Sequence, residues 1–239
     1  MKDRVLVIGL GGLGCPMARI LAEQGHALHL LDDDVVDVTN LQRQILFEPD
    51  DVGRPKVEAA RDRLLAFGAR EVVVTRERMR PDTALRLLRD HALVVEGTDN
   101  YASKFLAFDA ARAVGVPIVS AGAVRWSGWT MASFPHEGPC LRCVFEDVPS
   151  SGGATCAEAG VVGPVVGVVG AMAAGLALSI LRGDSPRGIL LRYDGLAGRV
   201  RSSRPLPRPG CPSCEGLIEG LSPDGYAPKC GDLNLTNRS

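Results

Sequence analysis

The feature that most constrains this chain is a glycine cluster near its start. Gly9, Gly11 and Gly14 form the pattern G-x-G-x-x-G, directly after the Val/Leu/Ile-rich run 4–8 and at the start of the helical pattern 13–24. Glycines between a strand and a helix permit a tight turn and let backbone N–H groups approach a phosphate at the helix N-terminus. A tight turn without a ligand would use the same glycines, but the strand–helix context favours a ligand.

Asp32 extends this pattern at the end of a second expected strand, 27–31. An acidic residue there is placed to accept hydrogen bonds from a ribose, which is typical of an adenosine-binding Rossmann unit. The pattern indicates an adenosine-containing ligand without saying which one. An NAD-dependent oxidoreductase would use the same glycines and the same aspartate, and it is the main alternative function.

The rest of the chain alternates between helical and strand patterns. We expect helices at 56–66, 82–89 and 102–113, and strands at 71–75, 92–96, 116–120 and 188–193. Nearly continuous Val, Leu and Ile in these strands favour a sheet covered on both faces. The aromatic, strand-like segment 124–134 suggests antiparallel additions. We therefore predict an α/β fold, a Rossmann-like and mostly parallel sheet with helices on both faces, extended by antiparallel strands.

The residues after Asp32 suit a triphosphate better than NAD. Segment 32–44 is a long polar excursion where a simple β-α-β unit turns directly into a helix. Arg43 offers a fork of donors for phosphate oxygens, and Lys56 offers a point charge at an expected helix start. Two cations near a glycine loop favour the triphosphate of ATP, because the backbone N–H groups alone already hold a pyrophosphate such as that of NAD.

Asp99 follows the expected strand 92–96, at the carboxyl edge where open α/β sheets bind ligands. A carboxylate near phosphates is placed to bind Mg²⁺. The same residue could instead cap the helix that begins near Ala102. The residues alone leave these two roles open.

Four of the seven cysteines form two C-x-x-C pairs, Cys140 with Cys143 and Cys211 with Cys214. Two such pairs predict one tetrahedral four-thiolate Zn²⁺ site, and a redox dithiol is the weaker alternative because it normally involves a single pair. The long separation argues against an independent zinc ribbon. The odd cysteine count and the length of 239 residues argue against a secreted disulfide framework.

Two apolar segments invite a membrane interpretation, and neither fits it well. In 1–18, Asp3 lies where a signal peptide is basic, and four glycines and Pro16 interrupt the run. Segment 159–181 is uncharged, but five glycines and five alanines make it weakly hydrophobic, so we expect a helix buried on all sides. The net charge of −1 gives no overall attraction to nucleic acid or membranes. We expect a cytoplasmic protein, and an exposed loop at 140–159.

Four motifs in one order resemble the ThiF/MoeB/HesA family, the bacterial relatives of ubiquitin-activating enzymes. They are Gly9-Leu10-Gly11-Gly12-Leu13-Gly14, the segment 32–44, Gly53-Arg54-Pro55-Lys56-Val57 and Gly97-Thr98-Asp99-Asn100. The resemblance covers residues 4–214, and four ordered motifs are far more specific than one. It implies one adenylation domain, 1–214, that includes the cysteine pairs. The order of the tail, 215–239, stays open.

The resemblance also implies roles for individual residues. Nucleotide-binding residues would be Gly9, Gly11, Gly12, Gly14, Asp32, Asp34, Asn40, Arg43, Gln44, Lys56 and Asp99. Within this set, Asp32 and Asp34 lie at and near the ribose, Arg43 and Lys56 act on the triphosphate, and Asp99 holds Mg²⁺. Cys140, Cys143, Cys211 and Cys214 are the implied zinc ligands. Cys156 is a candidate for sulfur transfer, with an incidental cysteine as the equal alternative.

The implied activity is ATP-dependent adenylation of the C-terminal glycine carboxylate of a ubiquitin-like sulfur-carrier protein that ends in Gly-Gly, with release of pyrophosphate. Family precedent implies a homodimer. Because 239 residues leave no room for a rhodanese-like domain, we expect a separate sulfur donor. Family members also carry an N-terminal helical segment with an arginine that reaches the neighbouring subunit's triphosphate. The expected first strand begins within a few residues of Met1, so this arginine has no counterpart here, and a catalytically inactive relative is a second alternative.

Overall fold

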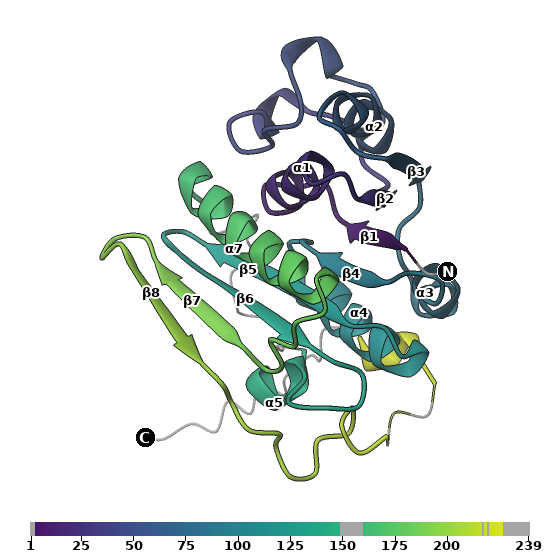
Figure 1. Cartoon of the computed structure of the whole chain (residues 1–239), viewed down its shortest axis with the longest axis vertical. Coiled ribbons are helices and arrows are strands. Elements are labelled where there is room, and N and C mark those ends of the chain that lie inside the picture. Colours follow the sequence, from purple (N-terminus) through teal and green to yellow (C-terminus); the bar gives the residue numbers. More distant parts are fainter. Residues whose placement is uncertain (1–2, 149–159, 217, 219, 227–239) are drawn as a thin grey trace, which may run out of the picture.

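The computed structural model describes residues 3–148, 160–216, 218 and 220–226. Eight strands form one sheet in the order β3-β2-β1-β4-β5-β6-β7-β8 (Figure 1). The strands are β1 (Arg4–Ile8), β2 (Ala27–Leu31), β3 (Glu71–Thr75), β4 (Leu93–Glu96), β5 (Ile118–Val124), β6 (Ser127–Ser133), β7 (Leu190–Asp194) and β8 (Arg199–Ser203). Strands β1 to β5 run parallel, and β6, β7 and β8 continue the sheet antiparallel.

Helices cover both faces of the sheet (Figure 1). One face carries α1 (Gly14–Glu23), α2 (Lys56–Ala66) and α7 (Gly163–Leu181). The other carries α3 (Pro81–Leu88), α4 (Tyr101–Val114) and α5 (Leu141–Phe145). Three short 3-10 helices are η1 (Val38–Asn40), η2 (Pro49–Asp51) and η3 (Pro223–Gly225). The predicted fold class is confirmed, and β1, β2, α2 and β3 begin and end at the predicted residues.

The central strand β1 explains where the ligand edge lies. It pairs in parallel with β2 on one side and β4 on the other, so Val5 lies opposite both Leu28 and Leu93. The chain runs outward from β1 to β2 and β3, and then returns to the other side of β1 to form β4. At such a reversal of strand order, the connections after the two strands diverge and leave a crevice at the carboxyl edge. This crevice receives the glycine turn after β1 and the Gly97–Asn100 turn after β4.

One expectation for the second half of the chain was wrong in part, and one strand was not expected. The exposed loop expected at 140–159 begins with buried Cys140 and the helix α5, because the first cysteine pair packs inward against the second, and its residues 149–159 lie outside the described residues. The Pro/Arg-rich stretch before Cys211 contains strand β8, which the sequence did not predict. All five residues of β8 are exposed, so the stretch lacks the buried alternation that reveals a strand.

Helix α7 is buried on one side only, which corrects the expectation of burial on all sides. Pro164, Val168, Ala171 and Gly175 are exposed. They recur at helical spacing on the side away from the sheet, because no further layer of the described chain covers α7 there.

Among the helices of the described residues, only α7 is long and apolar enough to cross a membrane. A core helix passes the same test, and α7 packs against α1 and strands β4, β5 and β6. At Gly170 an added Cβ would lie 2.4 Å from Pro16 Cγ of α1. This close helix–helix contact makes α7 part of the folded core.

Part of the C-terminal tail packs against the domain. Tyr226 is 7% exposed, and its hydroxyl donates to Asp109 Oδ2 over 3.1 Å. Asp109 also forms a buried ion pair with Arg142 at 2.9 Å. The tail therefore returns to α4 and α5 as far as residue 226, which the sequence left open.

A histidine pair on the α3 side of the sheet makes the stability of the fold depend on pH. His29 Nδ1 of β2 lies 2.9 Å from His91 Nε2, and His29 Nε2 lies 2.8 Å from Thr75 Oγ1. Burial lowers the pKa of His29 from 6.5 to about 4, and His91 and Arg4 act in the same direction. Between these two values the unfolded chain binds more protons at this position than the folded chain. The free energy of unfolding should therefore be fully retained above pH 6.5 and should fall as the pH drops toward 4.

We expect His29→Gln to reduce this loss of stability between pH 6.5 and about pH 4, the pKa values of His29 in the unfolded and in the folded chain. Urea unfolding at a series of pH values measures the effect. His136→Gln is the matched control, since His136 is exposed in the loop after β6 and should keep the wild-type pH dependence. An unchanged slope in His29→Gln would assign the pH dependence to other groups.

Candidate nucleotide and metal sites

The glycine turn after β1 requires glycine at two positions. Gly9 has a φ of +83°, a conformation that side chains rarely adopt. At Gly14 an added Cβ would lie 1.8 Å from the carbonyl oxygen of Gly9. A side chain at Gly14 would therefore push α1 away from the end of β1.

This turn leaves hydrogen-bond donors open toward the ligand edge. The backbone N–H groups of Gly11, Gly12 and Leu13 donate no hydrogen bond within the described part of the chain. Leu13 occupies the N-cap position of α1 without a side-chain cap. Free N–H groups together with the positive end of the helix dipole form an anion site.

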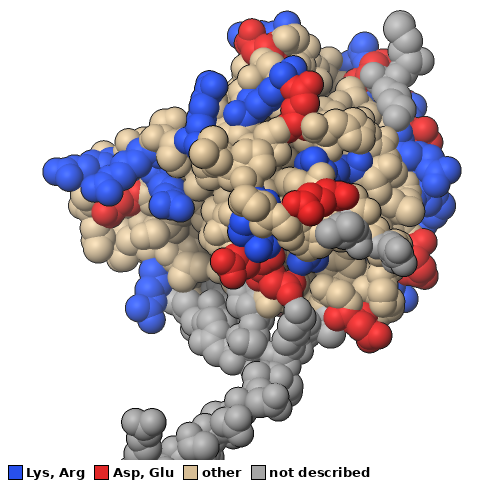
Figure 2. Space-filling model, turned by 90° about the horizontal axis from the view of Figure 1, so that it is seen from below, with Lys and Arg blue, Asp and Glu red and all other residues tan. Residues whose placement is uncertain are grey.

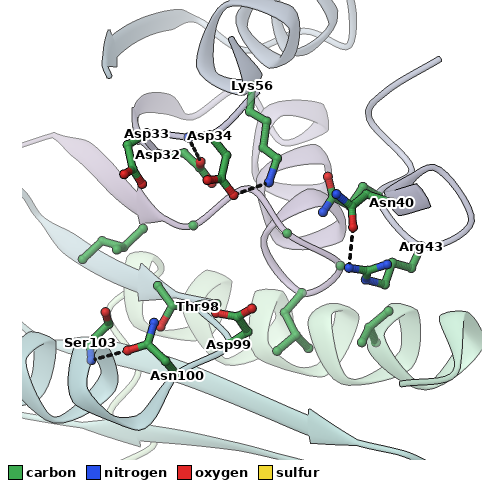
Figure 3. A pocket seen from close by; sticks show the side chains of 18 of the residues that line it. Asp32, Asp33, Asp34, Asn40, Arg43, Lys56, Thr98, Asp99, Asn100 and Ser103 are labelled. Atoms are coloured by element: carbon green, nitrogen blue, oxygen red, sulfur yellow. Dashed lines mark hydrogen bonds and ion pairs between the residues drawn. The ribbon is translucent and has the colours of Figure 1, made fainter. Parts of the chain in front are cut away.

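A cavity of ≈ 570 Å³ opens in front of the glycine turn (Figure 3). This size suits a nucleotide, since ligand cavities usually measure about 300–1,000 Å³. It brings together the predicted residues Gly9, Gly11, Gly12, Asp32, Asp34, Asn40, Arg43, Gln44, Lys56 and Asp99. Gly14 does not line the cavity and acts through the close packing of α1.

Asp32 is held rigidly at the end of β2. Its Oδ2 accepts from the backbone N–H of Leu10 at 2.6 Å, and its Oδ1 accepts from that of Asp34 at 2.9 Å. Burial raises the pKa of Asp32, and the positive charge of Lys56 opposes this effect. Each carboxylate oxygen keeps a second lone pair, so Asp32 can still accept from a ribose hydroxyl.

Lys56 is bound to Asp34 in the ligand-free structure. Its Nζ lies 2.8 Å from Asp34 Oδ2, and its side chain is 5% exposed while that of Asp34 is 66% exposed. The backbone N–H of Lys56 also donates to the carbonyl of Asp34 at 3.0 Å. An ammonium has three donors, so Lys56 can bind a phosphate oxygen without leaving Asp34. Asp34 thus positions the lysine at the cavity.

Arg43 lies beside the glycine turn, with its Cγ 3.3 Å from the Cβ position of Gly12. Its Nη2 donates to Asn40 Oδ1 at 2.5 Å, and neither interacts with a carboxylate among the described residues. Gln44 is 3% exposed, and its buried Oε1 has no hydrogen-bond partner there. An unpartnered buried amide oxygen at a cavity wall is consistent with a site whose polar groups are completed by a ligand.

Asp99 faces the cavity from the side opposite Lys56 (Figure 3). Its carboxylate is exposed and forms no hydrogen bond or ion pair with any residue that the structure describes. Asn100 is the N-cap of α4, since its Oδ1 accepts from the backbone N–H of Ser103 at 2.8 Å. The helix therefore does not use Asp99 as a cap, and its carboxylate remains available to a cation.

Sequence reasoning missed two parts of the cavity wall. Glu77, Arg78 and Met79 line it from the turn after β3, and residues 160–161 line it from the approach to α7 together with Val166 in the first turn of that helix. The first group could have been found, because the turn after a parallel strand lies at the same edge as the others. No local signal places the start of α7 beside the glycine turn.

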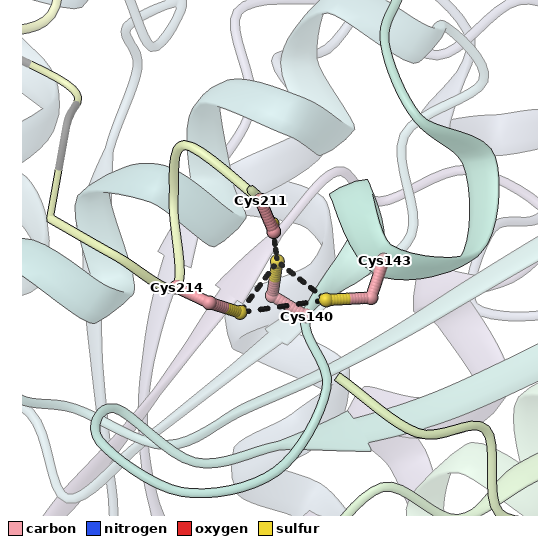
Figure 4. A group of neighbouring side chains, drawn as sticks. All are labelled: Cys140, Cys143, Cys211 and Cys214. Carbon is pink, nitrogen blue, oxygen red and sulfur yellow. Dashed lines mark hydrogen bonds between the residues drawn. The ribbon is translucent and has the colours of Figure 1, made fainter. Parts of the chain in front are cut away.

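The four predicted cysteines form a second site (Figure 4). Cys140 Sγ lies 3.9 Å from Cys143 Sγ, 3.6 Å from Cys211 Sγ and 3.5 Å from Cys214 Sγ, and Cys143 and Cys214 are 3.4 Å apart. Thiolates around one tetrahedral Zn²⁺ at about 2.3 Å lie about 3.8 Å apart. The observed distances match this geometry and are too long for disulfides.

The backbone supports this cysteine cluster. The N–H of Arg208 donates to Cys143 Sγ at 3.3 Å. Burial raises the pKa of Cys140, and burial also raises that of Cys214 to about 11. A cation bound among the four sulfur atoms would favour their thiolate forms. Cys156, the candidate for sulfur transfer, lies outside the described residues.

Charge is unevenly distributed over the surface. Lysine and arginine side chains gather at the left edge of Figure 2, where Figure 1 shows the β7–β8 hairpin. This hairpin carries the exposed residues Arg192, Arg199 and Arg201, with Asp194 beside them. Elsewhere on the visible face, basic and acidic side chains are mixed.

Solved structures share this fold. The crystal structure of E. coli MccB with MccA-N7isoASN superimposes with a TM-score of 0.79 at 22% identity, over 89% of this chain and 67% of that one. The crystal structure of PaaA gives a TM-score of 0.70, also at 22% identity, over 86% of this chain and 64% of that one. At this identity the likeness concerns the fold alone.

Closer relatives are found by sequence. The sulfur carrier protein adenylyltransferase of Thermus thermophilus is 38% identical over 89% of this chain and 82% of its own length. The molybdopterin-synthase adenylyltransferase of Salmonella typhimurium is 37% identical over 90% of this chain and 88% of its own length.

A third relative is longer. The adenylyltransferase and sulfurtransferase MOCS3 of Xenopus laevis is 36% identical over 96% of this chain, which spans 52% of that protein. The ThiF family model matches residues 1–213, the part of the chain that holds the glycine turn, the cavity and three of the four clustered cysteines. Sequence, fold and site agree, and the chain belongs to the ThiF family.

Proposed function

We propose that the protein uses ATP to adenylate the C-terminal glycine carboxylate of a ubiquitin-like sulfur-carrier protein. The observation that carries this proposal is the convergence of free N–H groups, Asp32, Arg43, Lys56 and Asp99 on one cavity. The relatives at 37% and 38% identity are named molybdopterin-synthase adenylyltransferase and sulfur carrier protein adenylyltransferase. A nicotinamide dinucleotide would leave Arg43, Lys56 and Asp99 without a role.

In the proposed reaction, an oxygen of the carrier's terminal carboxylate attacks the α-phosphorus of ATP, and the bond to the bridging oxygen of pyrophosphate breaks. Both reactants are anions, so the protein must offset their repulsion. Arg43 and Lys56 place two cations beside the glycine turn, where the triphosphate would lie. The carboxylate is already ionised at neutral pH, so no general base is needed. Alignment of the two bound reactants supplies much of the remaining acceleration.

A magnesium ion fits the position of Asp99. The carboxylate faces the cavity, and the hydrogen bond that caps α4 comes from Asn100 instead. When bound, Mg²⁺ would neutralise charge on the phosphate oxygens. The proposed role of Asp99 is to hold that ion after the end of β4, across the cavity from Lys56.

The four-cysteine cluster is proposed to hold a structural Zn²⁺. All four ligand atoms lie within 4.8 Å of one another, and no open ligand position is provided for a substrate. The metal would join α5 to the segment after β8. We further propose a cytoplasmic homodimer with a separate sulfur donor, and a role for Cys156 in sulfur transfer rather than in adenylation.

Protein purified without added zinc should contain about one zinc per chain, as expected for a four-thiolate site. Cys211→Ser should lower both the zinc content and the melting temperature, because structural zinc contributes to folding free energy. Cys15→Ala is the matched control, since Cys15 is a buried thiol outside the cluster and its loss should leave the zinc content unchanged. A folded, metal-free protein that tolerates Cys211→Ser would remove the zinc site.

ATP with Mg²⁺ should raise the melting temperature more than NAD or NADP at the same concentration. The reason is that Arg43, Lys56 and Asp99 act on a triphosphate and its cation, and at equal concentration the ligand that binds the folded state more tightly stabilises it more. Differential scanning fluorimetry measures the shifts. A larger shift with a nicotinamide dinucleotide would favour the oxidoreductase alternative.

With a cognate carrier ending in Gly-Gly, the protein should exchange labelled pyrophosphate into ATP, and it should do so poorly without the carrier. Asp99→Ala should reduce exchange about a hundredfold, the effect of losing roughly 3 kcal/mol of electrostatic stabilisation. Lys56→Met should act in the same direction. Removal of the carrier's last glycine should abolish exchange, because the carboxylate would no longer reach the α-phosphorus.

Asp90→Ala is the control for Asp99→Ala. Asp90 is exposed and precedes β4, so it lies at the opposite edge of the sheet and should not affect exchange. If the authentic carrier supports no exchange and the Asp99 and Lys56 variants match the wild type, the protein is a nucleotide-binding relative without adenylating activity.

A further inference from the structure

A buried ion pair lies beneath the Gly97–Asn100 turn and plays no part in the chemistry described above. Glu96 is the last residue of β4, and its side chain is 0% exposed. Lys104 lies in the first turns of α4 and is 4% exposed. The Lys104 Nζ lies 3.2 Å from Glu96 Oε1 and 3.1 Å from Oε2.

Fold stability alone does not account for such a pair. Two charges that are removed from water lose hydration, and neutral residues of similar volume often serve as well or better. The pair is therefore better explained by the part of the structure that it holds in place than by a gain in folding free energy. Its other partners show which structure that is.

Glu96 and Lys104 join three parts of the ligand edge. Glu96 Oε1 accepts from the backbone N–H of Thr98 at 2.6 Å and from Thr98 Oγ1 at 2.5 Å. Glu96 Oε2 accepts from the hydroxyl of Ser120 on β5. Lys104 Nζ donates to the carbonyl of Ala121 at 2.5 Å. One buried pair thus ties the turn after β4 to both α4 and β5.

The turn that Glu96 holds is packed directly on the glycine turn. An added Cβ at Gly9 would lie 3.2 Å from both the backbone nitrogen and the Cγ2 of Thr98. An added Cβ at Gly97 would lie 2.9 Å from the backbone nitrogen of Gly14. This contact places the turn that carries Thr98 and Asp99 directly beside the phosphate-binding backbone.

Asp99 depends on these contacts for its position. Its own carboxylate has no partner among the described residues, whereas Thr98 before it is bound by Glu96 and Asn100 after it caps α4. We propose that the Glu96–Lys104 pair positions Asp99 and thereby sets the affinity of the nucleotide site for its divalent cation. This inference rests on the proposed function, since it takes ATP and Mg²⁺ as the ligands.

The decisive variant is Glu96→Gln/Lys104→Met, which removes both charges together and leaves neither one buried alone. Thermal shift with ATP in EDTA, followed by titration with Mg²⁺, gives the Mg²⁺ concentration at half of the additional stabilisation. We expect this midpoint to rise roughly five- to tenfold, the effect of replacing charge-assisted hydrogen bonds by neutral ones. The affinity for ATP in EDTA should stay within about twofold, because the glycine turn, Arg43 and Lys56 are intact.

Two further variants separate positioning from general destabilisation. Thr98→Val removes one of the bonds to Glu96 and should shift the midpoint in the same direction by less. Asp109→Asn/Arg142→Met removes a second ion pair that is buried on both sides in the described part of the chain, with side chains 1% and 8% exposed. That pair lies between α4 and α5, so its removal should change the melting temperature without moving the Mg²⁺ midpoint.

The proposal would be overturned if the folded Glu96→Gln/Lys104→Met variant kept the wild-type Mg²⁺ midpoint. If that variant does not fold, a wild-type midpoint in Thr98→Val would overturn the proposal instead. An equal shift in the Asp109/Arg142 control would overturn it too, and so would a wild-type protein with no Mg²⁺-dependent stabilisation. The thermal measurement needs no carrier. A wild type that binds Mg²⁺ with ATP but supports no pyrophosphate exchange would therefore refute the adenylating function and still decide the role of the pair.

Discussion

The functional architecture depends on a backbone contact between glycines. Gly14 lies against the carbonyl of Gly9, and Gly97 lies against the nitrogen of Gly14, so the turns after β1 and β4 interlock at the start of α1. No side chain fits between them, because the Cβ of Gly14 would overlap the Gly9 carbonyl at 1.8 Å. This contact brings the helix N-terminus, Asp32 and Asp99 to one cavity. The ligand edge is therefore set by backbone packing before any charge is considered.

The charges around this contact differ in how much of their interaction capacity is already used. Lys56 is paired with Asp34, and Asp32 is fixed by two backbone N–H groups. Arg43 contacts neutral oxygens, and Asp99 has no partner in the described chain. Groups that are held rigidly but incompletely satisfied are preorganised for a charged ligand, since little reorganisation is needed when it binds. The proposed ATP site has this character.

Much of the fold was predictable from local sequence, and ten of the cavity residues were expected from the motifs and from the family resemblance. The strands β1, β2 and β4 are short, mostly buried and mostly apolar runs bounded by turn signals, and β3 is a short run of half-buried valines. The spacing of the cysteine pairs indicated the second site. The failures have physical causes. Strand β8 is exposed on all residues and shows no alternation. Helix α7 is uniformly apolar, so its sequence does not distinguish burial on one side from burial on all sides. The choice between Asp99 and Asn100 as the cap of α4 depends on a single hydrogen bond.

The sequence by itself determined the alternation of strands and helices, which gives a mostly parallel sheet. It also determined the glycine turn, the cysteine pairs and the identity of the polar residues at the strand ends. These features depend on residue type and spacing, which act within a few residues along the chain. Only the tertiary structure decided that α7 closes the cavity beside Arg43, that Glu77–Met79 complete its wall, and that Glu96 and Lys104 hold the turn carrying Thr98. The first two relations join segments far apart in sequence, where packing rather than local preference determines which side chains meet. Glu96, Thr98 and Lys104 are close in sequence, and their pairing depends on burial against Ser120 and Ala121 of β5.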